Sequence, residues 1–354
     1  MKFEQKSINA YKERLKDLLK VSSPSGKERV MANHIAEIAG PLAESVQFDN
    51  YGNLMVKVGG KGKKLMLSAH IDELGYWIKS ISPEGFLHAT KIGIPDKAVE
   101  ARQVIVNGRI PGIVGTMAAH LQSPEDRRKL MDPRDIFIDI GASSKAEAEA
   151  LGVRIGSYAS PVYNYMEMSN SDKICCRALD NRAGCAVLLE LLANVDKSKL
   201  KYELWLAFTL QEEVGLRGAA AAVNWLVPDM MIAVDTVPCA DTPGIKWKKD
   251  LPAYLGGGVV CSISEGMGPM NFIHPDMEEK IMRLCEEHDI PIQPLSVCGY
   301  SASTDALGSV TQARGIAGAT LTIPRRYSHS PTELMDVKDA IAMLRLLECF
   351  VTEK

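Results

Sequence analysis

The sequence contains no long apolar run, no excess of charge of one sign and few aromatic residues. Its longest nearly apolar stretches, such as residues 204–210, are far shorter than the roughly 18 residues that a membrane-spanning helix needs. Lysine and arginine number 41 against 44 aspartate and glutamate, which gives a formal net charge of -3. Because the chain has no basic surplus to attract phosphate groups, we expect neither a nucleic-acid partner nor a membrane partner.

The sequence also lacks a CxxC motif, although it has eight cysteines, all of them at residue 175 or later. Most of them stand inside apolar stretches, which is typical of reduced, buried thiols in the cytoplasm. The first 20 residues alternate charged and apolar side chains at helical spacing, without an apolar core followed by a cleavage site. They predict a surface helix rather than a signal peptide, and the expected location is cytoplasmic.

The order of predicted elements indicates two domains, in keeping with a length of 354 residues. Residues 1–73 and 169–354 alternate strands and helices, which predicts an α/β catalytic domain with a mostly parallel sheet sandwiched by helices. Residues 74–168 contain short β-like runs separated by glycine and proline, which predicts a small β-rich domain inserted between them. The strands predicted outside the insertion are residues 46–49, 53–58, 64–72, 202–210, 230–234 and 319–323. After the first helix, further helices are predicted at residues 27–38 (capped by Ser25), 145–151 (capped by Ser143 or Ser144), 182–192, 217–225, 276–288 and 337–350.

Polar side chains collect where the predicted strands end. In an open α/β sheet, ligands bind beyond the carboxyl ends of the strands, so residues at those positions are candidates for a site. Two further candidates stand near the start of the helix at 182–192 and shortly after the last strand. Together these positions supply five acidic residues and two histidines, namely His70, Asp72, Asp180, Glu212, Glu213, Asp235 and His329.

Carboxylates gathered at one edge repel one another unless cations neutralise them. Imidazole together with carboxylate suits zinc or a similar first-row metal. Two divalent ions would carry a charge of +4 against -3 from Asp180, Glu213 and Asp235, and a bridging hydroxide would bring the sum to zero. This count leaves one of the adjacent pair Glu212 and Glu213 free to act as a base.

Each candidate also has a structural explanation when it is taken alone. His70 is typical of a hydrogen-bonded core histidine, Asp180 of a helix cap, and Glu212 with Glu213 of a solvated turn. Their joint position at strand ends favours a site, because clustered charges point to function more often than single ones. The remaining histidines have no comparable neighbourhood and are expected on the surface or in packing: His34, His88, His120, His274 and His288.

Other catalytic motifs fail on inspection. There is no HExxH motif, and residues 299–303 miss the second glycine of a serine-hydrolase nucleophile elbow. The glycines at 256–258 lack the context of a dinucleotide-binding loop. A glycosidase with two catalytic carboxylates has little use for two histidines, and 6% aromatic residues offer few platforms for sugars.

Five motifs resemble, in order, those of the tetrahedral, glutamyl-aminopeptidase-like family of dinuclear metallo-aminopeptidases. They are residues 69–73 (AHIDE), 178–184 (ALDNRAG), 211–215 (QEEVG), 234–236 (VDT) and 324–330 (PRRYSHS). The resemblance covers nearly the whole chain, including residues 138–142 (IDIGA) of the β-rich insertion. The motifs together are specific for this family.

The resemblance implies two divalent metal ions per subunit, with zinc or cobalt expected and manganese as a third choice. His70, Asp180 and Asp235 would hold one ion, and Asp180, Glu213 and His329 the other, with Asp180 as the bridge. Glu212 would be the general acid/base, and Asp72 would orient His70. The insertion would contribute dimer contacts, and dimers would assemble into a hollow homo-oligomeric dodecamer that admits only short peptides.

The sequence departs from the family pattern at one loop. The family commonly has two glycines before Thr-Asp-Ala, whereas this chain has Ala302 and Ser303 before Thr304. If the loop uses a backbone conformation that glycine adopts cheaply, these two residues must reshape it, which bears on substrate preference. Asn181, where many members have a second aspartate, is a milder change.

The expected function is therefore metal-assisted hydrolysis of the N-terminal peptide bond of a short peptide. Two ions would lower the pKa of a bridging water and polarise the scissile carbonyl. Glu212 would remove the proton of this water and pass it to the departing amine. Three alternatives remain open, namely a related di-metal deacylase or carboxypeptidase, a glucanase-type glycosidase, and a non-catalytic binding shell.

Overall fold

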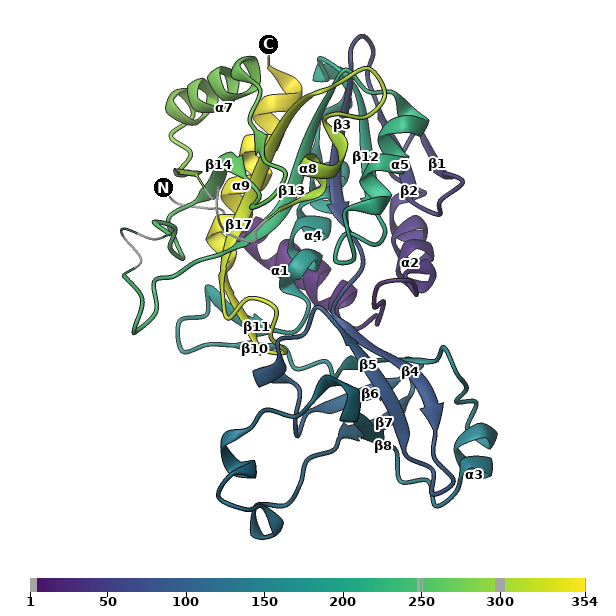
Figure 1. Cartoon of the computed structure of the whole chain (residues 1–354). Coiled ribbons are helices and arrows are strands. Elements are labelled where there is room, and N and C mark those ends of the chain that lie inside the picture. Colours follow the sequence, from purple (N-terminus) through teal and green to yellow (C-terminus); the bar gives the residue numbers. More distant parts are fainter. Residues whose placement is uncertain (1–4, 247–248, 250, 297–302, 354) are drawn as a thin grey trace.

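The computed structural model describes residues 5–246, 249, 251–296 and 303–353. Figure 1 shows a large lobe built on one mixed sheet and, below it, a smaller lobe, which we call the barrel. The chain leaves the large lobe after β3 (Lys64–His70), forms the barrel, and returns to the large sheet at β10 (Met166–Glu167) and β11 (Lys173–Cys176). The catalytic and inserted segments predicted at residues 1–73, 74–168 and 169–354 remain our proposed division of the chain.

Four parallel strands form the centre of the large sheet, in which twelve of the described strands take part. In spatial order they are β12 (Glu203–Thr209), β3, β13 (Met230–Pro238) and β17 (Ala317–Arg326). Antiparallel strands complete the two sides: β2 (Leu54–Gly59) and β1 (Ser45–Phe48) beside β12, and β18 (Glu333–Asp336), β11 and β10 beside β17. A branch also pairs with β17 and consists of β14 (Val259–Glu265), β15 (Asn271–Phe272) and β16 (Ile292–Ser296). The predicted α/β fold with a parallel core of strands is confirmed.

Helices cover both faces of this sheet, because the central strands carry apolar side chains on both of their sides. Leu65 and Leu67 of β3 face a large core, whereas Met66 faces a smaller core on the other side. The large core is covered by α1 (Gln5–Leu19), α2 (Arg29–Ala39), α4 (Leu179–Asn194), α7 (Pro275–Glu287) and α9 (Val337–Thr352). The opposite face carries α5 (Arg217–Leu226) and α8 (Asp305–Ser309).

The barrel is a closed sheet with its own apolar core. Its strands follow the order β4 (Gly75–Ile81), β5 (Leu87–Ile92), β8 (Phe137–Asp139), β7 (Ile110–Val114), β6 (Gln103–Val106) and β9 (Tyr158–Pro161). Its helix α3 (Lys145–Ala150) begins after Ser144, whose side chain accepts from Glu147 N, so the predicted cap is confirmed. Short 3-10 turns are η1 (Asp96–Ala98), η2 (Ala119–Leu121), η3 (Asp126–Arg128) and η4 (Pro133–Asp135), with η5 (Lys197–Lys199) in the large lobe.

A buried polar joint ties the barrel to the large lobe. Glu73, the residue between the two lobes, is 1% exposed and pairs with Arg177. Its Oε1 accepts hydrogen bonds from Ser23 N at 2.8 Å and from Ser160 Oγ of β9 at 3.0 Å. Because a buried carboxylate with these partners is costly to separate, the joint fixes the barrel beside the end of β3.

Two local expectations differ from the structure. Ser25 does not cap the second helix, which begins at Arg29 after Glu28; instead the Ser25 hydroxyl donates to Asp72 Oδ2 at 2.7 Å. The helix predicted from residue 182 is assigned from Leu179, but Asp180 and Asn181 have non-helical backbone angles. Within the described residues, no helix combines the length and apolar character that crossing a bilayer requires.

Candidate active site

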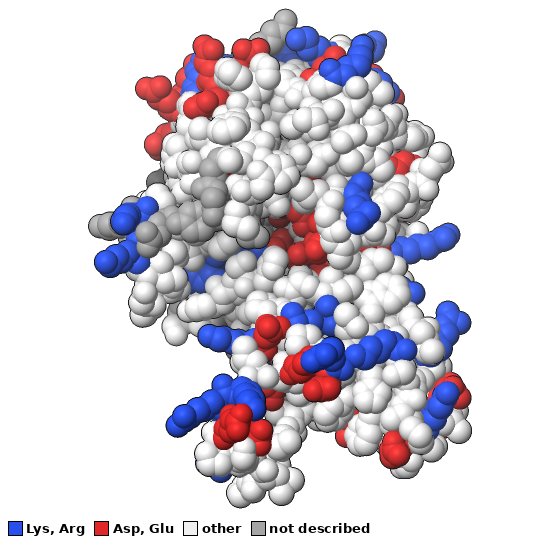
Figure 2. All heavy atoms as spheres, in the orientation of Figure 1, with Lys and Arg blue, Asp and Glu red and all other residues white. Residues whose placement is uncertain are grey.

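A cavity of about 480 Å³ lies at the carboxyl ends of the central strands. Figure 2 shows a group of carboxylates in a hollow where the large lobe meets the barrel. Six of the seven side chains selected from the sequence line this cavity, and the seventh, Asp72, lies directly beneath His70 and is fully buried. Segments far apart in the sequence therefore converge on one acidic pocket.

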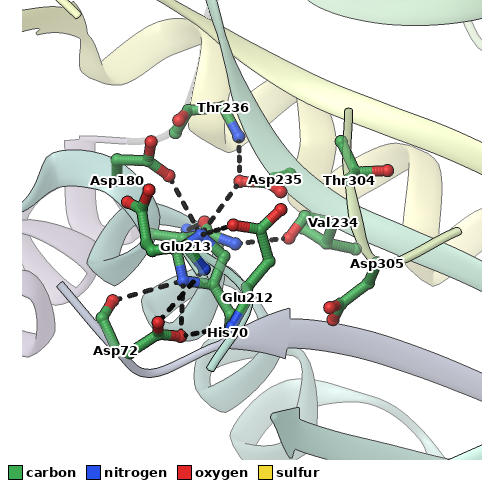
Figure 3. Close-up of polar contacts among 12 residues, drawn as sticks. His70, Asp72, Asp180, Glu212, Glu213, Val234, Asp235, Thr236, Thr304 and Asp305 are labelled. Atoms are coloured by element: carbon green, nitrogen blue, oxygen red, sulfur yellow. Dashed lines mark hydrogen bonds and ion pairs between the residues drawn. The ribbon is translucent and has the colours of Figure 1, made fainter. Parts of the chain in front are cut away.

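His70, Asp180 and Asp235 form the first group of possible metal ligands, with ligand atoms all within 4.8 Å of one another. His70 Nε2 lies 3.1 Å from Asp180 Oδ1 and 3.6 Å from Asp235 Oδ1 (Figure 3). Asp235 reaches the pocket from within β13 because β3 pairs with that strand only as far as Ala233. The end of β3 thus uncovers the side chain of its neighbour.

Asp180, Glu213 and His329 form the second group, again within 4.8 Å. His329 Nε2 lies 3.5 Å from Asp180 Oδ2 and 3.6 Å from Glu213 Oε2. Asp180 therefore presents one oxygen to each group, which is the placement that a bridging carboxylate needs. Asp180 lies between β11 and the regular part of α4. Its non-helical backbone angles turn the side chain toward the cavity.

Asp72 holds the histidine and the glutamate turn at the same time. Its Oδ1 lies 3.3 Å from His70 Nδ1 and accepts from Glu212 N at 3.0 Å. Its Oδ2 accepts from Glu213 N at 3.2 Å and from the Ser25 hydroxyl. A donor role for His70 Nδ1 toward Asp72 leaves Nε2 free to face the two carboxylates of the first group.

Glu212 stands beside the first group without being part of it. Its Oε2 lies 4.0 Å from His70 Nε2, and the residue is only 9% exposed. Burial raises the pKa of its carboxyl well above the usual range, and the nearby Asp235 and Glu213 raise it further. A carboxyl with a raised pKa at the edge of a cavity is suited to proton transfer.

Without bound cations, the carboxylates of the pocket would carry more negative charge than its cationic side chains neutralise. Burial, with Asp180 nearby, raises the pKa of Glu213 to about 8, and burial also raises the pKa of Asp235. Although burial opposes it, the carboxylates raise the pKa of His70 well above its usual range and that of His329 to about 9. Glu213 Oε1 is buried without a hydrogen-bond partner among the described residues. Imidazole and carboxylate donors with an unsatisfied buried oxygen fit the binding of divalent cations.

Two residues at this site escaped the sequence-based selection of ligands. Arg325 lies in the motif at residues 324–330, yet its role emerges only from its contacts with Asp180, Glu333 and the Thr236 hydroxyl. The Glu333 carboxylate accepts hydrogen bonds from Asp180 N, His329 N and the Arg325 guanidinium. None of the sequence motifs included this residue. A charged residue directly after the run 317–324, which contains no charge, and an acidic residue at the start of the next strand are the only sequence signals of this buried pair.

The other residues discussed in the sequence analysis lie at the rim of the pocket, outside it, or outside the described residues. Ser303 lines the cavity, whereas Ala302 lies outside the described residues. Asn181 caps the regular part of α4, because its Oδ1 accepts from Gly184 N at 3.0 Å. His288, expected on the surface or in packing, is half-buried, and its Nε2 lies 2.9 Å from Glu353 Oε1 with Cys349 close to both.

An α/β fold with such donors at its strand ends is typical of metal-dependent hydrolases. A model of the M42 glutamyl aminopeptidase family matches residues 52–346, so the chain belongs to this family of aminopeptidases. It is a peptidase that hydrolyses N-terminal peptide bonds, and peptidases of this family depend on metal.

Similar proteins agree with this assignment over the whole chain. The putative aminopeptidase FrvX of Escherichia coli is 31% identical over 345 residues, covering 96% of this chain and 94% of FrvX. The structure of an aminopeptidase from the archaeon Desulfurococcus kamchatkensis matches with a TM-score of 0.90 and 31% identity, covering 98% of this chain and 96% of that one. The TET1 peptidase of Pyrococcus horikoshii matches with a TM-score of 0.86 and 29% identity, covering 97% and 100%.

One similar structure carries a different description. A Thermotoga maritima protein described as an endoglucanase matches with a TM-score of 0.76 and 27% identity, covering 95% of this chain and 96% of that one. The likeness keeps a β-glucan among the substrates that a test of function must include.

Proposed function

We propose that this chain is a dinuclear metal-dependent aminopeptidase that removes N-terminal residues from short peptides. The observation that carries the proposal is the position of Asp180, which offers one oxygen to His70 and the other to His329. A single carboxylate between two histidine-containing groups is the arrangement that two neighbouring cations require. The family assignment supplies the peptide bond as substrate.

His70, Asp180 and Asp235 would hold one ion, and Asp180, Glu213 and His329 the other. Zinc or cobalt suits this mixture of imidazole and carboxylate, with manganese as a third choice. Bound there, two divalent ions supply Lewis acidity toward the scissile carbonyl and lower the pKa of a water molecule.

Glu212 is the proposed general acid/base. Its carboxylate would take a proton from the attacking water and return that proton to the departing amine. Its neighbour Glu213 would serve as a ligand. Asp72 accepts hydrogen bonds from the backbone N–H groups of both residues, which holds each side chain in place for its own role. Asp72 also keeps His70 turned so that Nε2, rather than Nδ1, faces the cavity.

The shape of the cavity supports action on chain ends. Its volume of about 480 Å³ fits the range of small-ligand pockets and accommodates one or two residues. The barrel lies close beside it: a Cβ built on Gly93 in the β5–η1 loop would lie 3.7 Å from Glu213 Oε2. A free amino terminus would be attracted by the acidic walls or bind an ion, which favours exopeptidase over endopeptidase action.

We also propose a cytoplasmic homo-oligomer in which the barrel mediates dimer contacts and dimers assemble into a dodecamer. The similar Pyrococcus horikoshii TET1 peptidase can assemble into a tetrahedron or a large octahedral shell. On the barrel, Ile113, Leu121 and Ile155 are 52%, 78% and 72% exposed, which leaves apolar surface to cover. Light scattering on the purified chain measures its mass in solution, and a monomer would contradict this assembly.

The direct test of function is a substrate panel measured with metal-free protein and with added zinc, cobalt or manganese. We expect hydrolysis of aminoacyl anilides and short peptides with a free amino terminus, only when metal is present. The same peptides with an acetylated amino terminus are the matched control and should remain uncut. Preferential hydrolysis of acylated amino acids would indicate a deacylase, release of C-terminal residues a carboxypeptidase, and metal-independent cleavage of β-glucan a glycosidase. No hydrolysis with any metal would favour a binding shell.

A further inference from the structure

Glu333 is a buried carboxylate that touches the site from behind. It begins β18, is 1% exposed, and belongs to neither group of proposed metal ligands. Its Oε1 accepts from His329 N at 2.9 Å and pairs with Arg325, and its Oε2 accepts from Asp180 N at 3.1 Å. One side chain thus binds three segments: the start of α4, the end of β17 and the loop between β17 and β18.

The two backbone N–H groups that Glu333 binds belong to proposed ligands, neither of which has right-handed helical backbone angles. His329 has a φ of 58°, a left-handed backbone conformation that residues other than glycine rarely adopt. Asp180 has φ of -82° and ψ of 107°, which is outside the helical region although the residue lies in α4. A left-handed residue of this kind persists where surrounding contacts determine it, and Glu333 supplies such a contact to His329. For Asp180, whose backbone is extended, Glu333 supplies the partner of the N–H group at the point where the chain enters α4.

Glu333 also shares the buried positive charge of Arg325 with Asp180. The guanidinium is 2% exposed, pairs with Asp180 Oδ2 and Glu333, and donates from Nε to the Thr236 hydroxyl at 2.6 Å. Without the charge of Glu333, Asp180 would be the only carboxylate paired with this buried cation among the described contacts. Arg325 would then compete more strongly with cations for the oxygen that Asp180 presents to His329.

From these contacts we propose that Glu333 is a positioning residue for the second metal ion, the one expected at Asp180, Glu213 and His329. It orients two of the three ligands through their backbones and shares the charge of Arg325 with Asp180. This inference rests on the proposed pair of ions. It assigns Glu333 no contact with the substrate.

The test is a titration of the metal-free, full-length Glu333→Gln variant with Co²⁺, followed by calorimetry. Glutamine keeps the size of the side chain but loses its charge. If its carbonyl oxygen stays on His329 N and Arg325, the NH2 group that faces Asp180 N can only donate, so this hydrogen bond is lost. We expect one of two binding steps to weaken by about 10–100-fold, the usual effect of losing a residue that orients metal ligands. The other step, which uses His70 and Asp235, should change much less.

Asp339→Asn is the matched control. Asp339 is also 1% exposed and accepts two backbone hydrogen bonds, from Gly256 N at 2.8 Å and Gly258 N at 2.7 Å, but it touches no proposed ligand. Its replacement should lower thermal stability and leave both Co²⁺ affinities unchanged. A loss of Co²⁺ affinity equal to that of Glu333→Gln would show that any buried carboxylate has this effect, which would overturn the proposal.

Kinetics distinguish positioning from a general structural role. At saturating Co²⁺ the Glu333→Gln variant should regain turnover with an unchanged KM for the peptide, because its ligands are all present. If that variant does not fold, Glu333→Asp keeps the charge with a shorter reach and should show the same weakened step to a smaller degree. Wild-type affinity for both ions in either folded variant would overturn the inference. Fewer than two Co²⁺ ions on the wild-type chain would instead contradict the proposed dinuclear function.

Discussion

At the scale of single residues, the site separates two adjacent glutamates that the sequence alone leaves interchangeable. Glu213 lies 3.6 Å from His329, within the second ligand group, whereas Glu212 Oε2 lies 4.0 Å from His70 Nε2. Both carboxyls are buried, and Glu212 also lies within 4.8 Å of His70 and Glu213, but only Glu213 joins a group with both Asp180 and His329. This difference is why we propose Glu212 for the proton-transfer role.

Replacing Glu212 with glutamine should abolish turnover without releasing metal. Loss of a general acid/base typically costs about 100- to 10,000-fold in rate, whereas the amide remains similar in size and none of the proposed ligands changes. Elemental analysis and peptide hydrolysis measured on one preparation check both halves of the prediction. Glu279→Gln, on the exposed side of α7, is the control and should behave as wild type. Near-normal activity of the Glu212 variant would show that the base is misassigned.

Metal affinity should increase with pH. In the metal-free protein the pKa of His329 is raised to about 9 by Asp180 and Glu213 against the effect of burial, and burial raises that of Glu213 to about 8. Both groups must lose their protons to act as ligands, so each bound proton weakens binding by about tenfold per pH unit below its pKa. Competition with a chelator of known affinity between pH 6 and 8 measures the slope. An affinity independent of pH in this range would contradict the ligand assignment.

At the scale of elements, the strand β3 positions the site most directly. It lies between β12 and β13, is buried on both faces, and ends at His70. Leu67→Ala removes a fully buried side chain from the large core and should lower the free energy of unfolding by about 2–5 kcal/mol. Urea denaturation of metal-free protein checks this value. Val30→Ala on α2, where the side chain is 58% exposed, should cost less than about 0.5 kcal/mol.

The sequence predicts these elements well because apolar periodicity and strand length are local signals. The strand 64–72 and the helix 337–350 fall within a few residues of β3 and α9. The convergence of His70, Asp180 and His329 could be expected because parallel strands bring their carboxyl ends to one edge. Local patterns carry no information on the contact of Ser25 with Asp72 or of Glu333 with Asp180, since both join residues far apart in the chain.

At the scale of the whole molecule, the inserted barrel lies beside a pocket that is lined by residues of the large lobe. Glu73 and Arg177 hold the lobes together, and the loop at Gly93 lies against Glu213. The barrel therefore has two proposed uses, one in limiting access to the cavity and one in assembly. Both follow from a position that the chain sets directly after the strand carrying His70.

The central claim is that one acidic pocket holds two cations that share Asp180. Anomalous diffraction from crystals loaded with zinc or cobalt, recorded on both sides of the absorption edge, tests it most directly. We predict two peaks per chain, one beside His70 and Asp235 and the other beside Glu213 and His329, with Asp180 between them. A single peak, an empty pocket, or metal bound only elsewhere on the chain would contradict the claim.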